Sequence, residues 1–115
     1  MIELTVDEAY AFDFLSILKV KSNRRREAMP AYEDCRINLM RQLGERKFIE
    51  VESSTDYLSL IQANSTLFDA IDLVKLNKAT ANDLDELNYK RFLLKKALQK
   101  KFFENEVQEI KIGYT

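Results

Sequence analysis

The sequence predicts a single, mainly α-helical domain of about four helices, in an antiparallel, bundle-like arrangement spanning residues 1–115. Three observations favour this fold class. Apolar residues recur at three- and four-residue spacing through most of the chain, which is the period of an amphipathic helix. Only two glycines and one proline interrupt the pattern. A chain of 115 residues has room for one hydrophobic core but not for two.

The first helix is expected over about residues 6–21. Thr5 and Glu8 have the spacing of a capping box, in which the two side chains bind backbone N–H groups at the start of a helix. The polar run SNRRR at 22–26 ends this helix. A second helix follows Pro30, which suits a first-turn position, and Gly44 is its expected C-terminal cap.

The remaining helices follow from apolar spacing and from cap residues. The segment ERKFIEVE at 45–52 fits either a continuing helix or a short strand, and we favour the helix. A third helix is expected over about 56–77, because no glycine or proline lies inside it. A fourth begins with Thr80 or Asn82 as its cap and runs to about residue 105.

Both ends of the chain alternate apolar and polar residues, the period of a half-buried strand. This alternation predicts a small terminal β-pair as an addition to the helical domain. A lone pair of strands is marginal in water, so it would need helix packing or a second subunit. The alternating residues are Ile2, Leu4 and Val6 at one end, and Ile110, Ile112 and Tyr114 at the other.

The composition excludes most familiar kinds of active site. The chain has no histidine, so it cannot form a Ser-His-Asp or Cys-His catalytic group or an HExxH zinc site. Two glycines cannot make a glycine-rich phosphate loop. Cys35 is the single cysteine and is expected to be an inert core thiol. We therefore predict no catalytic residue and no cofactor.

The charge balance and the short apolar runs bear on partners and location. The net charge is −1, which provides no overall field to attract nucleic acid or an acidic membrane. The longest apolar runs are far shorter than the ~20 residues that span a bilayer. A single cysteine also gives no sign of an oxidising compartment. We expect a soluble, cytoplasmic protein without a membrane role.

Five polar residues fall on the apolar stripes of the predicted helices when each helix is drawn at about 100° per residue. An unpaired carboxylate is too costly to bury, so the aspartate among them must be paired if it lies inside. We hypothesise that the five meet in one interior or cleft-lining cluster, which either holds a small anion or fixes the register of the helices. The alternative is a purely structural network, or long side chains at stripe edges that reach solvent. These residues are Asp13, Asn64, Asn88, Arg91 and Lys95.

The segments around these residues, at 9–21, 63–71 and 87–95, resemble a family of short helical proteins of bacteria and phages that has no established function. The shared features are an aspartate ahead of an Ile-Leu-x-x-Lys run, an asparagine shortly before an aromatic residue, and an asparagine ahead of basic residues. Phe14 stands where the family pattern has a lysine. The resemblance implies a helical fold and an origin in bacteria or phages, and it implies no activity.

Two acidic pairs offer an alternative function. Asp69 with Asp72, and Asp83 with Glu86, have the one-turn spacing that lets carboxylates share a divalent metal. Helical nucleotide pyrophosphatases use pairs of this kind, so a metal-dependent nucleotide hydrolase is one interpretation. The other is a solvated helix face, which we favour because acids are expected in the first turn of a helix.

Basic residues give a third candidate function. The arginines at 24–26 and the mixed Lys-Phe run at 100–103 could contact phosphates. Arginines in a polar connector usually face solvent, and the charge balance argues the same way. Nucleic-acid binding is therefore disfavoured.

The surplus of apolar helix surface favours self-association. The predicted fourth helix has a second apolar side, and the first helix is apolar nearly all round. Helices that are apolar on two sides must be covered on two sides. We therefore expect a homodimer with an isologous interface, and a non-enzymatic structural or adaptor role whose process the sequence does not name. The residues concerned are Tyr89, Phe92, Leu93 and Phe103 in the fourth helix, and Ala11, Leu15 and Leu18 in the first.

Overall fold

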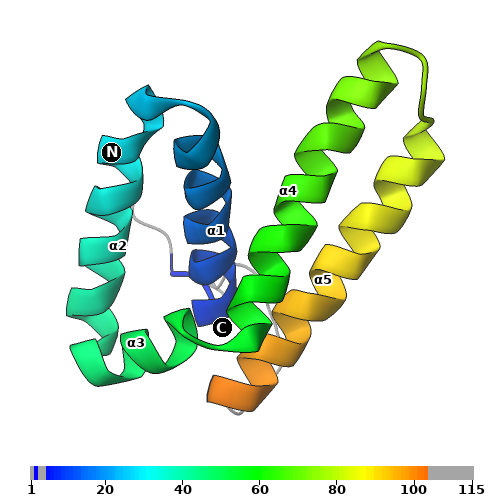
Figure 1. Cartoon of the computed structure of the whole chain (residues 1–115). Coiled ribbons are helices and arrows are strands. Elements are labelled where there is room, and N and C mark those ends of the chain that lie inside the picture. The colour runs from blue at the N-terminus through cyan, green and yellow to red at the C-terminus, as the bar shows by residue number, and fades with distance from the viewer. Residues whose placement is uncertain (1, 3–4, 104–115) are drawn as a thin grey trace.

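A computed structural model describes residue 2 and residues 5–103, and this part of the chain is almost entirely helical (Figure 1). The prediction of a mainly α-helical fold is confirmed. The number of helices is five in the described part, where about four were expected. They are α1 (Glu8–Arg24), α2 (Met29–Leu43), α3 (Glu45–Glu52), α4 (Thr55–Lys75) and α5 (Ala81–Phe103), with a single 3-10 turn, η1 (Arg26–Ala28), after α1.

The additional helix arises at Gly44. This glycine has φ 87° and ψ 146°, a conformation that residues with a side chain rarely adopt. Its N–H donates to the carbonyl of Met40 at 2.9 Å, which ends α2, and its own carbonyl accepts from the N–H of Phe48 at 3.0 Å, which starts α3. Gly44 is therefore the C-terminal cap that was predicted. The segment 45–52 is helical, as favoured, but it forms a separate helix.

The start of α1 differs from the prediction. The helix begins at Glu8 after Asp7, whose side chain makes no capping hydrogen bond, so the predicted capping box at Thr5 is wrong. The N–H of Ala9 instead donates to Oε1 of Gln99 in α5 at 2.7 Å. The start of this helix is capped by a neighbouring helix and not by its own first turn.

The ends of the α4–α5 hairpin follow local rules. Ser54 caps α4 by accepting a hydrogen bond from the N–H of Tyr57 at 3.1 Å. Asn77, in the left-handed region with φ 58°, closes the other end of α4 in the manner typical of helix C-termini. Thr80 and Asp83 bind each other's backbone N–H groups, at 2.8 and 3.3 Å, so Thr80 is the cap of α5, one of the two residues expected.

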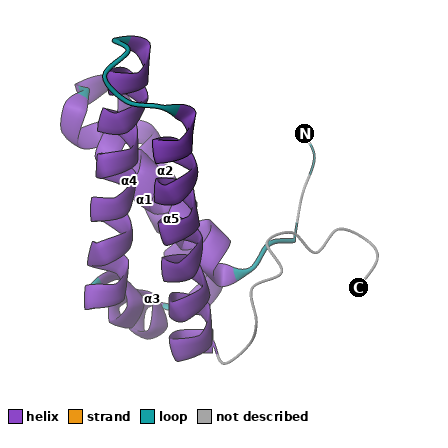
Figure 2. Cartoon of the chain, turned by 90° about the vertical axis from the view of Figure 1, so that its right-hand side faces the viewer, coloured by secondary structure: helices purple, strands orange, loops and turns teal. Residues whose placement is uncertain are grey.

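The helices are arranged around α1. α4 and α5 form an antiparallel hairpin on one side of α1, α2 packs on the other side, and α3 connects the lower end of α2 to the lower end of α4 (Figure 1). The view turned by 90° shows α4 and α5 running side by side (Figure 2). The main core lies toward the α3 end, where Phe12 stacks on Phe48 and meets Tyr57 edge-on, with ring centroids 5.7 Å apart in both pairs. Burial raises the pKa of the Tyr57 hydroxyl above its ordinary value.

Two further expectations concern the ends of the chain and the membrane. The segment 110–114 and residue 4, which the predicted terminal β-pair requires, lie outside the described residues. Within 5–103 there is no strand apart from an isolated bridge position at Val6. None of the helices in this part of the chain combines the length and the apolar character needed to cross a membrane.

Candidate functional site

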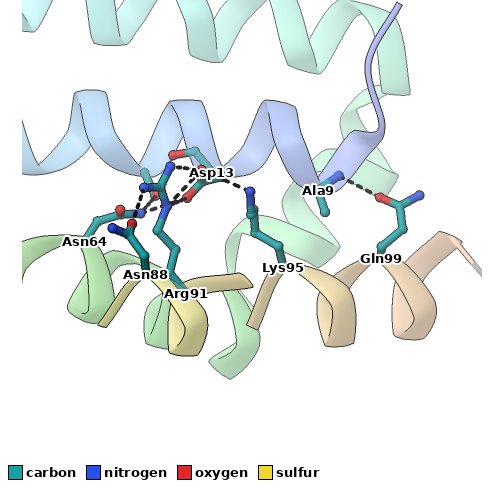
Figure 3. Close-up of polar contacts among 8 residues, drawn as sticks. Ala9, Asp13, Asn64, Asn88, Arg91, Lys95 and Gln99 are labelled. Carbon is teal, nitrogen blue, oxygen red and sulfur yellow. Dashed lines mark hydrogen bonds and ion pairs between the residues drawn. The ribbon is translucent and has the colours of Figure 1, made fainter. Parts of the chain in front are cut away.

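A carboxylate buried between three helices is the centre of the candidate site (Figure 3). Asp13 of α1 is 2% exposed. It meets Asn64 from α4, and Arg91 and Lys95 from α5. The structure therefore brings together four of the five polar residues that the helix patterns singled out. The fifth, Asn88, lies at the rim: it is exposed, and its contact with Arg91 is 3.5 Å long.

Arg91 is the main partner of Asp13. Its Nη2 lies 2.5 Å from Oδ2, and its Nε lies 3.0 Å from Oδ1 and 3.2 Å from Oδ2. The planar guanidinium thus faces both carboxylate oxygens, the geometry in which arginine binds a carboxylate most strongly. Lys95 adds a second positive charge, with Nζ 3.9 Å from Oδ2. That ammonium also lies 5.8 Å from the centroid of the Tyr10 ring.

Asn64 connects α4 to the same carboxylate. Its amide nitrogen donates to Oδ1 of Asp13 at 3.0 Å and to the hydroxyl of Ser16 at 2.7 Å. The Ser16 hydroxyl in turn donates to the backbone carbonyl of Asp13 at 2.6 Å. All three residues are buried. The Asn64 amide nitrogen and the Ser16 hydroxyl are therefore hydrogen-bonded where three apolar helix faces meet, as most buried polar groups in native proteins are, whereas the Asn64 amide oxygen is buried without a hydrogen-bond partner among the described residues.

The sequence analysis missed two further buried polar residues at these helix contacts, Ser16 and Gln99. Gln99 is fully buried. Its Oε1 accepts from the N–H of Ala9, and its Nε2 donates to Oε2 of Glu8 at 2.7 Å. The signal for Gln99 was present, because it lies four residues beyond Lys95 on the same stripe of α5. Ser16 carries no such signal, since serine is common on any face of a helix.

The arrangement is suited to holding three helices in place. The Asp13 carboxylate is bound by donors from α4 and α5, and it faces the helix interface. Three surface grooves of the described part are lined by other residues and do not include Asp13, Asn64 or Arg91. Of the two roles hypothesised for the cluster, the geometry favours fixing the register of the helices over binding a small anion.

The members of the two acidic pairs considered as metal ligands make separate contacts. Asp69 binds Arg24, with Oδ1 3.0 Å from Nη2, and Asp83 caps α5. The hydrogen bond from the Thr80 backbone, followed by the one from its hydroxyl, lowers the pKa of Asp83. Asp72 and Glu86 are exposed. Within the described residues, these acids do not gather into a group of three or more that could hold a metal ion.

No family model matches this chain, and no curated protein or solved structure matches it. The resemblance to short helical proteins of bacteria and phages therefore stays a prediction that the motifs alone carry.

Proposed function

We propose that this protein is a non-enzymatic structural or adaptor protein that acts through self-association as an isologous homodimer. One observation carries the proposal: an exposed apolar surface on α1 and α5, called here the aromatic face. Its members and their exposed fractions are Phe14 (52%), Tyr89 (63%), Phe92 (38%) and Leu93 (45%).

The four side chains belong to one surface. Tyr89, Phe92 and Leu93 have i, i+3, i+4 spacing and share a face of α5. Phe14 directly follows Asp13, and Phe92 directly follows Arg91, its ion-pair partner. The pairs Ala9–Gln99 and Asp13–Arg91 show that α1 and α5 are antiparallel. When two antiparallel helices pack together, the residues that directly follow a contacting pair point toward the same side of the two helices. Phe14 and Phe92 therefore flank one surface.

The size of the aromatic face fits an interaction site. At roughly 200 Å² for a fully exposed aromatic side chain, its three aromatic members leave about 300 Å² of ring surface in water. Patches of this size on a single protomer are often functional. A stable dimer buries about 800 Å² on each partner, so these rings would form the centre of such an interface and be surrounded by a polar rim. Aromatic residues are the type most enriched at such centres.

The polar cluster supports the same role. Because Asp13, Asn64 and Arg91 tie three helices together, the aromatic face lies on a scaffold whose register is fixed. Association of two rigid surfaces loses less conformational entropy than association of mobile ones.

The test is the oligomeric state of the full chain, measured by sedimentation velocity over a range of micromolar concentrations. We expect a dimer for the wild-type chain. Tyr89→Glu, at the most exposed member of the aromatic face, should give a folded monomer. Leu58→Glu is the matched control, because Leu58 is an exposed apolar residue on α4 outside this face, and it should leave the dimer intact.

Two results would overturn the proposal. The first is a wild-type chain that stays monomeric throughout the concentration range. The second is an equal effect of Tyr89→Glu and Leu58→Glu on the dimer. Circular dichroism on each variant establishes that a loss of dimer is not a loss of fold.

A further inference from the structure

A groove of about 460 Å³ lies between the C-terminal end of α1, the η1 turn and the middle of α4. These segments can be followed in Figure 1 from the top of α1 across to α4. The volume falls in the range of small-molecule sites, ~300–1,000 Å³. The residues that line the groove are Lys21, Arg24, Arg25, Glu27, Ala28 and Phe68.

The groove is positively charged at its edge. Lys21 and Arg25 contribute cationic groups, and neither is paired with a carboxylate among the described residues. Glu27 is the one acid that lines the groove in this part of the chain. Basic residues near a helix C-terminus are ordinary, because they interact favourably with the helix dipole. Here they surround a concave surface, which a merely solvated helix end does not require.

The floor of the groove is apolar and held in place. The Arg24 guanidinium lies 5.7 Å from the centroid of the Phe68 ring. Its Nη2 donates to the carbonyl and to the hydroxyl of Ser65, both at 3.1 Å, and pairs with Asp69 at 3.0 Å. Arg24 is therefore fixed in position, and with Phe68 and Ala28 it forms a surface on which a flat apolar group can pack. The cations left for an anion are Lys21 and Arg25.

We propose that this groove is a binding site for a small organic anion, consisting of a phosphate or carboxylate group attached to an aromatic body. The aromatic body packs on Phe68 and the Arg24 guanidinium, and the acidic group is bound by Arg25 and Lys21. Guanidinium groups bind both phosphate and carboxylate through paired N–H donors. None of the residues that line the groove belongs to the aromatic face, so the proposal does not depend on self-association.

The experiment is an NMR titration of the ¹⁵N-labelled full chain with phenyl phosphate as the probe. Inorganic phosphate supplies the acidic group alone, and benzyl alcohol supplies the aromatic body alone. We expect saturable shifts from phenyl phosphate at the backbone amides of residues 21–28 and 65–69. Inorganic phosphate should bind roughly tenfold more weakly at equal ionic strength, because burying an aromatic ring contributes about that much affinity. Benzyl alcohol should give no saturable shift.

Two neighbouring arginines provide a matched pair of variants. Arg25→Ala removes a cation that lines the groove, whereas Arg26→Ala makes the same change of charge at a residue that does not line it. Both side chains are exposed, so neither change should affect the fold. Arg25→Ala should raise the dissociation constant for phenyl phosphate roughly fivefold, and Arg26→Ala by less than about twofold.

Several outcomes would overturn the proposal. Equal weakening by the two variants would mean that the chain attracts anions only through its general charge. Equal affinity for inorganic phosphate and phenyl phosphate would remove the role of the apolar floor. Shifts that appear at residues 89–93 and not at 21–28 would place the bound probe on the aromatic face.

Discussion

Replacing Arg91 by methionine tests whether the buried carboxylate of Asp13 depends on its partner. Methionine keeps an unbranched apolar stem of similar length, so the main change is the loss of the guanidinium. The variant loses the three contacts of 2.5–3.2 Å between Arg91 and Asp13. Asp13 would keep the amide of Asn64 at 3.0 Å and the ammonium of Lys95 at 3.9 Å.

The expected cost follows from the burial of the carboxylate. The Asp13 side chain is 3% exposed, so water cannot replace the lost donors without opening the helix interface. Removing one partner of a buried pair typically costs 3–5 kcal/mol. Because Lys95 stays nearby, we take the lower end and expect a loss of about 3 kcal/mol in the free energy of unfolding. That is a large share of the ~5–15 kcal/mol total for a domain.

Arg36→Met is the matched control. Arg36 faces Glu52 through the same fork, with Nε 2.6 Å from Oε2 and Nη2 2.7 Å from Oε1. The Glu52 side chain is 20% exposed, so it can be hydrated when its partner is removed. This change should cost only about 1 kcal/mol.

Urea denaturation followed by circular dichroism, at one protein concentration, measures both costs. If Arg91→Met is no more destabilising than Arg36→Met, the argument from the buried carboxylate is wrong. The double variant Asp13→Asn/Arg91→Met adds a second check, because removing both charges should cost less than the sum of the two single changes. Additive costs would show that the two residues are not coupled.

Three further predictions concern single positions. Gln99→Met removes the acceptor for the Ala9 N–H; it should cost about 1–2 kcal/mol and speed hydrogen exchange at the Ala9 amide, and an unchanged exchange rate would count against this cap. Gly44→Ala should cost about 2 kcal/mol in urea denaturation, because the backbone conformation at this position is strained for any side chain. A steric clash is not the cause, since no atom lies within 4 Å of an added Cβ. Gly44→Asn should be no better, because ψ 146° lies outside the left-handed helical region that asparagine tolerates. The carboxyl of Asp83 should titrate below its ordinary pKa of 3.8 in a ¹³C NMR titration, so that its contribution to stability is present above that pH and lost as the pH falls through the lowered pKa; Thr80→Ala should reverse only the smaller part of this shift, which comes from the hydroxyl.

Much of the fold and part of the site follow from local pattern. A glycine after a periodic apolar run marked the end of α2, and a threonine ahead of acids marked the start of α5. The polar residues on apolar stripes pointed to Asp13, Asn64, Arg91 and Lys95, because a polar group in such a position must find a partner. These inferences need only the period of the helix and the cost of burying polar groups.

The remainder depends on contacts that a local pattern does not contain. Thr5 and Glu8 have the spacing of a capping box, yet the cap of α1 comes from Gln99, 90 residues further along the chain. The separate helix α3 depends on the backbone conformation of Gly44. A glycine cap in the sequence predicts that one helix ends there, but it does not predict that another helix begins directly after it. Ser16 joins the cluster by accepting a hydrogen bond from Asn64. The packing of the whole domain decides which helix α1 faces at that position.

The polar cluster also explains which side of α5 faces the core. This helix carries apolar residues on two sides: Leu94 and Leu98 point inward, whereas Tyr89 and Leu93 remain exposed. Hydrophobic burial alone discriminates poorly between the two sides, because it is non-directional. Rotating α5 to bury the other side would carry Arg91 away from Asp13 and leave a buried carboxylate without its main partner, a cost of several kcal/mol. The ion pair therefore selects one rotation of α5, and the side that it leaves outward is the aromatic face.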